Sequence, residues 1–512
     1  MEEHKRKHGG NSILRAVFVG VSLLIQIGWL LLLILRLNEY STWISLLTSI
    51  LSLVVVLQLY SKHTTAAMKM PWIMLILVLP VMGLSLYMLI EVFGDLGKTG
   101  KRLKSVRGQI LTNLHQDENL LSQLERQDMS AANCCRYLLD FAQSPVYENT
   151  DVVYYARATD AFEAMKMELE KAENFIFMEY FIVRDDSSFR EIREILERKA
   201  RQGVDVRLMY DDVGSIGYVN FQFARDLNNR GIRCQVFNPA LPVLNLFMNH
   251  RDHRKITVID GKVGFTGGYN LADEYFDREQ PYGQWKDTGI KLEGEAVRSL
   301  TASFLEMWNT AAGVQEDCRP YLDACGSVPA RGFVQPYGDN PLDTERVAEN
   351  VYLNLIGRAK KTLYITTPYL IITDEMRSAL TLAAKRGVDV RIIVPGIPDK
   401  KTVYAVTRSY FTGLASQGVR IFTYTPGFVH AKMCLCDGDL ATVGTSNLDY
   451  RSLYLHFENN VLLYGCDAVK SIEEDFEAMF RQCAEVTDTY RTGRNAILRT
   501  WQCLLRLFAP LM

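Results

Sequence analysis

A motif that occurs twice constrains the fold of this chain more than any other feature of its sequence. The first copy runs from His253 to Asp260 and the second from His430 to Asp437, each with one residue between His and Lys and four between Lys and Asp. After six more residues, each copy enters a four-residue turn that ends in Asn270 or Asn447. This matched spacing predicts two related halves.

The halves also match outside this motif. The five residues from Gly203 to Arg207 are identical to those from Gly387 to Arg391, and the apolar strand pattern at 175–183 matches that at 363–371. A repeat of roughly 175 residues is too long for one unit of a solenoid. Because predicted strands alternate with helices, each half is expected to be an α/β unit with a mostly parallel sheet flanked by helices. Gly203 and Gly387 are predicted to form helix-to-strand turns.

The repeated residues suit chemistry on a phosphodiester. Strand alternation places His253 and Lys255 on one face, and likewise His430 and Lys432. If the halves pack about a pseudo-two-fold axis, two imidazoles and two ammonium groups meet at one point. One imidazole can then attack phosphorus, while the other donates a proton to the leaving alkoxide and later accepts one from the incoming alcohol. This chemistry needs no metal and no cofactor.

Other residues are expected to support these groups. Asp287 and Glu458 occupy matching positions in the two halves, and we expect them to orient the imidazoles and to stabilise their cations. The motif aspartates are interpreted as more structural than chemical, because each lies at a strand end where it can bind neighbouring backbone. The predicted catalytic set is His253, Lys255, Asp260, His430, Lys432 and Asp437. The predicted phosphate-binding or supporting set is Asn270, Asn447, Asp287, Glu458, Gly267, Gly268 and Ser446.

The first hundred residues contain three apolar segments, at 13–35, 43–60 and 71–93. The first has the length that crosses a ~30 Å hydrocarbon core, and no small-residue cleavage site follows it, which disfavours a removable signal peptide. Basic residues flank the apolar region on both sides. This balance favours two membrane spans with one interfacial segment over three spans, and both alternatives stay open.

The charge of the chain is nearly balanced, with 57 Lys and Arg against 59 Asp and Glu. A nuclease is expected to have a strongly basic groove, so the balance argues against nucleic acid as the partner.

The duplicated motif resembles that of the phospholipase D superfamily, which includes phospholipases, phospholipid synthases and nucleases. Within it, the membrane segments and four further runs resemble the bacterial cardiolipin synthases over nearly the whole chain. These runs are Asn249–Lys255, Trp285–Asp287, Thr367–Tyr369 and Asn447–Ser452. One residue departs from the family pattern, because His456 stands where asparagine is expected. No histidine matches it in the first half, which favours a local structural role.

The resemblance implies transfer of a phosphatidyl group from one phosphatidylglycerol to another, giving cardiolipin and glycerol. It implies His253 as nucleophile, through a phosphohistidine, and His430 as acid. It further implies a multi-pass protein of the bacterial cell membrane, with phosphatidylglycerol and the lipid bilayer as partners. A membrane-bound phospholipase D, which would release phosphatidic acid, shares all these residues and is the alternative; a nuclease of the superfamily is a weaker one.

The expected organisation is therefore two pseudo-symmetric phospholipase D-like halves preceded by transmembrane helices. The predicted parts are a membrane region at 1–96, a basic and polar connection at 97–150, a first half at 151–315, a connection at 316–345, a second half at 346–490 and an amphipathic C-terminal segment at 491–512.

Overall fold

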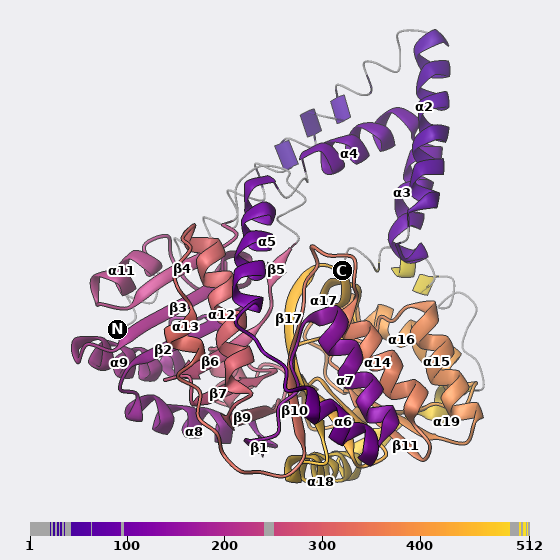
Figure 1. Ribbon diagram of the computed structural model, residues 1–512. Coiled ribbons are helices and arrows are strands. Elements are labelled where there is room, and N and C mark those ends of the chain that lie inside the picture. Colours follow the sequence, from indigo (N-terminus) through magenta and orange to yellow (C-terminus); the bar gives the residue numbers. More distant parts are fainter. Residues whose placement is uncertain are drawn as a thin grey trace.

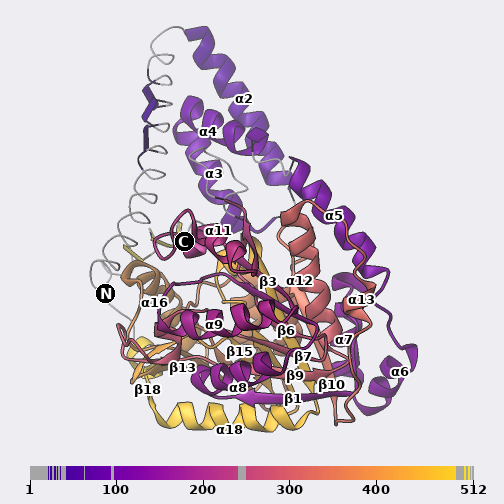
Figure 2. The same ribbon diagram turned by 90° about the vertical axis from the view of Figure 1, so that its left-hand side faces the viewer.

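The computed structural model describes residues 42–62, 64–93, 97–239 and 250–491, with scattered residues between 21 and 35 and between 501 and 509. Two sheets form the body of the molecule, the first half on the left of Figure 1 and the second on the right. Helices α2, α3 and α4 project from one side of this body, and the start of α3 contacts it (Figures 1 and 2).

The first half contains a mixed sheet. Its seven strands lie in the order β1 (Thr150–Tyr155), β9 (Gly289–Gly294), β7 (Val263–Gly267), β6 (Lys255–Ile259), β2 (Phe175–Tyr180), β3 (Asp205–Asp211) and β4 (Arg233–Phe237). Only β2–β3 and β3–β4 are parallel, and the other four pairs are antiparallel. The prediction of a mostly parallel sheet is therefore wrong. Crossover helices connect only β2, β3 and β4, whereas β6 and β7 are joined by a tight turn at Asp260 and Gly261, both with positive φ.

The second half repeats this topology. Its strands lie in the order β10 (Phe333–Asp339), β17 (His456–Tyr464), β16 (Leu440–Gly444), β15 (Met433–Cys436), β11 (Thr362–Thr366), β12 (Asp389–Pro395), β13 (Arg420–Tyr424) and β18 (Cys483–Glu485). The first seven correspond one by one to the strands of the first sheet, and β18 is an addition at the edge. The pseudo-symmetry expected from the repeat is thus present in the strand order.

Helices flank both sheets. In the first half they are α8 (Ala158–Lys171), α9 (Ser187–Arg201), α10 (Asp212–Ser215), α11 (Phe223–Asn229), η2 (Asp273–Phe276) and α12 (Val297–Ala312); in the second they are α14 (Val347–Arg358), α15 (Asp374–Lys385), α16 (Lys401–Ala415), α17 (Tyr450–Tyr454), α18 (Asp467–Arg481) and α19 (Thr487–Arg491). The two predicted helix-to-strand turns are confirmed, since Gly203 and Gly387 follow α9 and α15 with φ of 92° and 93°. Only glycine adopts this conformation without strain.

Both expected connections contain regular structure. Residues 97–150 form α5 (Gly97–Leu111), α6 (Glu118–Gln127) and α7 (Met129–Ala142), and 316–345 contains α13 (Arg319–Leu322) and β10. α7 contributes buried residues to the core of the second half, and buried residues of α5 pack with those of α12. Apolar positions at helical spacing within these polar segments, such as Leu103, Val106 and Ile110, account for the difference.

One apolar core joins the halves. Phe304 and Met307 of α12 lie in the same buried cluster as Phe476 and Met479 of α18. These are the closing helices of the two repeats, so their apolar faces hold the sheets in one fixed arrangement.

The N-terminal helices are α2 (Thr42–Ser61), α3 (Ala66–Val78) and α4 (Pro80–Phe93). Within the part of the chain that the structure describes, no helix combines the length and the apolar character needed to cross a bilayer. The predicted segment 71–93 is divided between α3 and α4, because Pro80 lacks an N–H and disfavours helical backbone at Leu79. Most of 13–35 and of 491–512 lies outside the described residues.

The two motif aspartates bind backbone and lie at the turns before the neighbouring strands. Asp260 accepts hydrogen bonds from the N–H groups of Glu173, Asn174 and Phe175 at 2.7–2.8 Å. Asp437 accepts the corresponding three bonds from residues 360–362 at 2.7–2.9 Å. Each aspartate thus ties the end of its motif strand to the start of the adjacent strand.

Substituting Asp260 by Asn should weaken this tie without changing side-chain size or the left-handed backbone that asparagine tolerates. An amide NH₂ would then face a backbone N–H, and we expect the free energy of unfolding to fall by about 1–3 kcal/mol. Thermal unfolding of the variant measures this as a lower midpoint. The exposed Asp226→Asn on α11 is the control; equal midpoints for both variants would contradict the structural role of Asp260.

Candidate active site

Two short strand pairs cross between the halves and build the site. β5 (Arg251–Asp252) pairs in parallel with β17, with Arg251 opposite His456. β14 (Gly427–Val429) pairs in parallel with β8 (Gln284–Lys286), with Phe428 opposite Trp285. The two registers are equivalent under the repeat. Each motif histidine follows directly on one of these strands, so it lies against the opposite half.

Each histidine is held by a carboxylate from the other half. Nδ1 of His253 lies 2.9 Å from both carboxylate oxygens of Glu458. Nδ1 of His430 lies 2.6 Å from Oδ2 of Asp287. Both carboxylates are fully buried. Because a carboxylate engages Nδ1 in each ring, Nε2 is the nitrogen that can face a substrate, and in His430 this nitrogen also lies 3.0 Å from Nζ of Lys432.

The side chain of each motif lysine folds back onto the motif histidine two residues before it. Nζ of Lys255 donates to the carbonyl of His253 at 2.5 Å. Nζ of Lys432 contacts the carbonyl of His430 and lies 3.0 Å from its Nε2. Burial lowers the pKa of Lys255 to about 8 and that of Lys432 to about 7. Desolvated ammonium groups of this kind gain strongly from an anion placed between them.

The two carboxylates differ in their charge state. Burial opposes ionisation of Asp287, but the facing His430 and Lys432 hold its pKa below the ordinary value. Burial raises the pKa of Glu458 to about 8, against the opposing effect of Lys255. An ionised Asp287 is the better partner for an imidazolium, so the environments distinguish the two histidines.

Burial also keeps both imidazoles neutral. It lowers the pKa of His430 to about 4, with a further contribution from Lys432. The pKa of His253 is well below its ordinary value, through burial and then the charge of Lys255. A bound phosphodiester would offset the lysine charges and favour a proton on His430.

Both histidines line one cavity of about 730 Å³ between the halves. Asn270 and Asn447 lie on its wall. Its wall also carries the aromatic residues Phe181, Tyr218, Tyr275, Tyr282, Trp285 and Tyr369 and the cations Arg184, Arg251, Lys400 and Arg451. The carboxylates Glu274, Glu279, Asp399 and Asp449 lie on the same wall, so the cavity combines apolar surface with charged groups of both signs.

The predicted supporting residues differ in whether their polar groups already have hydrogen-bond partners within the protein. Oδ1 of Asn447 is buried without a hydrogen-bond partner, whereas Asn270 accepts from the N–H of Ile182 and donates to the hydroxyl of Tyr275. The expected phosphate contact from the N–H of Gly268 is excluded, because this group donates to the carbonyl of Thr288 at 3.1 Å.

The remaining turn residues act on neighbouring protein groups. A Cβ at Gly268 would lie 2.0 Å from Oδ1 of Asp287, so glycine leaves room for this carboxylate. A Cβ at Gly267 would lie 2.4 Å from the carbonyl oxygen of Thr288. In the second half, Ser446 accepts a hydrogen bond from Asn460 at 2.8 Å, and the hydroxyl of the neighbouring Thr445 donates to Glu458.

The sequence analysis assigned no site role to four residues that lie on the cavity wall. Arg251 is paired with Asp211 at 2.9 Å, and burial lowers the pKa of Arg451. Trp285 packs on His430 with ring centroids 5.3 Å apart, and His456 packs on His253 at 5.4 Å. Arg251, Trp285 and His456 each lie two residues before a motif histidine or its carboxylate partner in the sequence. This spacing could have indicated that their side chains face the site.

A family model described as "Cardiolipin synthase, PLD-like domain" matches residues 165–308 and 352–480, which cover the two halves. The chain is 34% identical over 494 residues to a cardiolipin synthase of Halalkalibacterium halodurans, covering 95% of each chain. It is 39% identical over 355 residues to cardiolipin synthase 2 of Bacillus cereus, covering 69% of each.

Among solved structures, phosphatidylserine synthase of Haemophilus influenzae is similar, with a TM-score of 0.56 and 15% identity, over 75% of this chain and 98% of that one. This similarity concerns the fold.

Proposed function

Because this chain belongs to the family of cardiolipin synthases with phospholipase D-like domains, we propose that it transfers a phosphatidyl group from one phosphatidylglycerol to another, forming cardiolipin and glycerol. The chain is a phosphatidyltransferase. The observation that carries the mechanism is the reciprocal pair of histidine–carboxylate bonds between the halves.

In the first step, Nε2 of His253 attacks phosphorus of the donor lipid and the bond to the glycerol oxygen breaks. His430 donates a proton to this oxygen, and glycerol leaves. In the second step, neutral His430 takes the proton from a hydroxyl of the acceptor phosphatidylglycerol. The acceptor oxygen attacks phosphorus, the P–N bond breaks, and cardiolipin leaves with His253 restored.

The assignment of the two histidines rests on their carboxylates. Asp287, with a depressed pKa, favours the imidazolium that the acid step needs at His430. Glu458 is proposed to accept the Nδ1–H of neutral His253, which leaves the lone pair of Nε2 for attack on phosphorus. Lys255 and Lys432 are proposed to bind the non-bridging oxygens, together with Asn270 and Asn447.

The N-terminal helices are proposed to hold the site at the membrane, with the multi-pass attachment indicated by the sequence. Leu53 and Leu57 of α2 are 56% and 59% exposed, and Met74 and Leu77 of α3 are exposed as well. Ala67 and Met68 at the start of α3 pack against the core of the second half. A lipid-facing α2–α4 would therefore keep the cavity close to both lipid substrates.

Charge on the exposed face of α2 should weaken membrane binding. The double variant Leu53→Glu, Leu57→Glu should float with phosphatidylglycerol vesicles in a smaller fraction than the parent, since each substitution costs about 2–3 kcal/mol in a lipid environment. Density-gradient flotation measures the bound fraction. Leu382→Glu on α15, at a position 59% exposed, is the matched control. Equal flotation of all three proteins would refute the membrane role of α2.

The reaction is tested in vesicles of phosphatidylglycerol labelled in its phosphate, with a chelator present. The parent chain should form cardiolipin and glycerol, and His253→Ala and His430→Ala should each lower the rate by at least ~10³-fold, because the two imidazoles act as a unit. Thin-layer chromatography and mass spectrometry identify the products.

The exposed His115→Ala serves as the control for this assay and should keep full activity. Phosphatidic acid as the main product would identify a phospholipase D instead. Retained turnover in either histidine variant would end the two-histidine mechanism. Rapid denaturation during turnover should trap labelled phosphate on His253, whereas label on His430 would reverse the roles.

The lysine pKa values predict a pH dependence. Phosphate binding needs both ammonium groups, so kcat/KM should fall as pH rises through about 7 to 8, where the free protein loses these protons. Arginine stays charged in this pH range, so the decline of kcat/KM in Lys432→Arg should begin at a higher pH than in the parent, even if the maximal kcat/KM is lower. A pH–rate profile checks this, with the exposed Lys401→Arg as control. If kcat/KM of Lys432→Arg declined at the same pH as that of the parent, Lys432 would be excluded as the group whose deprotonation causes the decline.

A further inference from the structure

The mechanism leaves one buried imidazole of the cavity without a role. His456 is the first residue of β17, and only 8% of its surface is exposed. Neither ring nitrogen has a hydrogen-bond partner. A buried imidazole usually has at least one such partner, so this ring is suited to receive another group.

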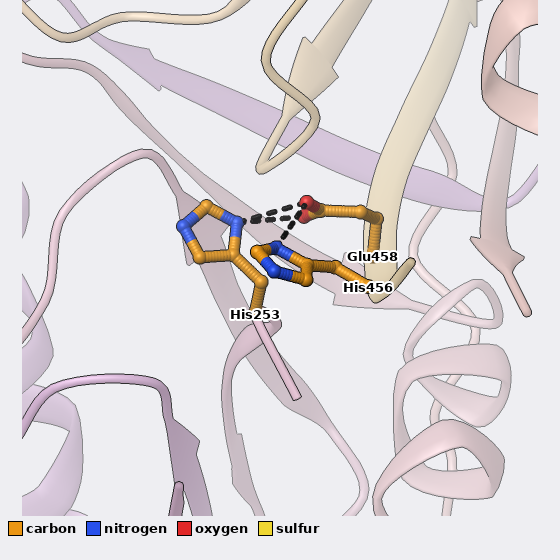
Figure 3. Close-up of side chains that lie close together, drawn as sticks. All are labelled: His253, His456 and Glu458. Carbon is orange, nitrogen blue, oxygen red and sulfur yellow. Dashed lines mark hydrogen bonds and ion pairs between the residues drawn. The ribbon is translucent and has the colours of Figure 1, made fainter. Parts of the chain in front are cut away.

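His456, His253 and Glu458 converge on one point (Figure 3). Nδ1 of His456 lies 3.9 Å from Oε1 of Glu458, and Nδ1 of His253 lies 2.9 Å from the same oxygen. One donor atom from each of the three residues lies within 4.8 Å of the others. Tetrahedral ligands on Zn²⁺ are roughly 3.3 Å apart, so closing the longest separation needs a shift of ~1.5 Å at most.

The register between β5 and β17 creates this arrangement, and the other half has no counterpart. Trp285 occupies the position equivalent to His456 and packs on His430. An indole cannot ligate a metal. Only the His253 side therefore contains two imidazoles and a carboxylate, a donor set that zinc favours, with the cavity open for a fourth ligand.

The charges nearby limit the affinity. Lys255 and Arg451 lie close enough to affect the ring of His456, and both oppose a divalent cation. A bound cation would favour the ionised form of Glu458, whose negative charge then offsets part of this repulsion. Binding is therefore expected to be reversible and weaker than in a structural zinc site.

We propose that His253, His456 and Glu458 form an inhibitory site for Zn²⁺ or a similar transition-metal cation. When Nδ1 of neutral His253 binds the metal, the ring proton must reside on Nε2. This nitrogen then has no lone pair to attack phosphorus, and Glu458 no longer orients the ring. Inhibition rests on the proposed function, whereas metal binding does not.

The test compares the full-length parent with His456→Asn, which installs the residue expected from the family pattern. Equilibrium dialysis should find one Zn²⁺ fewer per chain in the variant. In the vesicle assay without chelator, Zn²⁺ should inhibit the parent, EDTA should restore activity, and the variant should need at least tenfold more Zn²⁺ for half inhibition. Mg²⁺ should not inhibit either protein, because it prefers oxygen ligands.

The exposed His115→Asn is the matched control and should behave as the parent in both measurements. If His456→Asn does not fold, His456→Gln replaces it. Equal zinc stoichiometry in parent and variant would overturn the site, even if the chain made no cardiolipin. Loss of one bound Zn²⁺ with unchanged inhibition would overturn the inhibitory role.

Discussion

The structure depends on the bonds that each half makes to the histidine of the other. Glu458 of the second half holds His253 of the first, and Asp287 of the first holds His430 of the second. Neither half alone contains an oriented imidazole. The parallel pairs β5–β17 and β8–β14, and the apolar core to which α12 and α18 both contribute, fix the halves in the arrangement that these bonds need. Duplication of the motif is thus a requirement of the site.

Burial makes this arrangement chemically useful. The two lysines and the two histidines are removed from water, so their protonated forms are disfavoured and an anionic phosphate would restore them. The symmetry is broken where the two histidines must differ. Burial opposes ionisation of both carboxylates. His430 and Lys432 keep the pKa of Asp287 below its ordinary value, whereas the pKa of Glu458 stays raised although Thr445 donates to it. Trp285 and His456 extend this asymmetry to the cavity wall.

The predicted parallel pairing failed because local patterns did not determine which strands become neighbours. Strands alternating with helices indicated parallel pairing, but the turn at Asp260 and Gly261 returns the chain antiparallel. Residues 97–150 are polar in overall composition, but the apolar residues of α5 lie on one face and pack against α12. His456, which the sequence indicated as locally structural, packs on His253 of the opposite half. In each case the deciding contact lies far away in the sequence.

The sequence by itself determined the repeat, the residue types of the site and the helix-to-strand turns at Gly203 and Gly387, because these depend on spacing and on local backbone preference. It also placed Asp287 and Glu458 at matching positions. Only the tertiary structure decided that each carboxylate binds the histidine of the opposite half, that Gly268 makes room for Asp287, and that His456 lies beside His253. These contacts depend on how two sheets pack, which is set by the sum of many apolar contacts and has no signature in any one stretch of sequence.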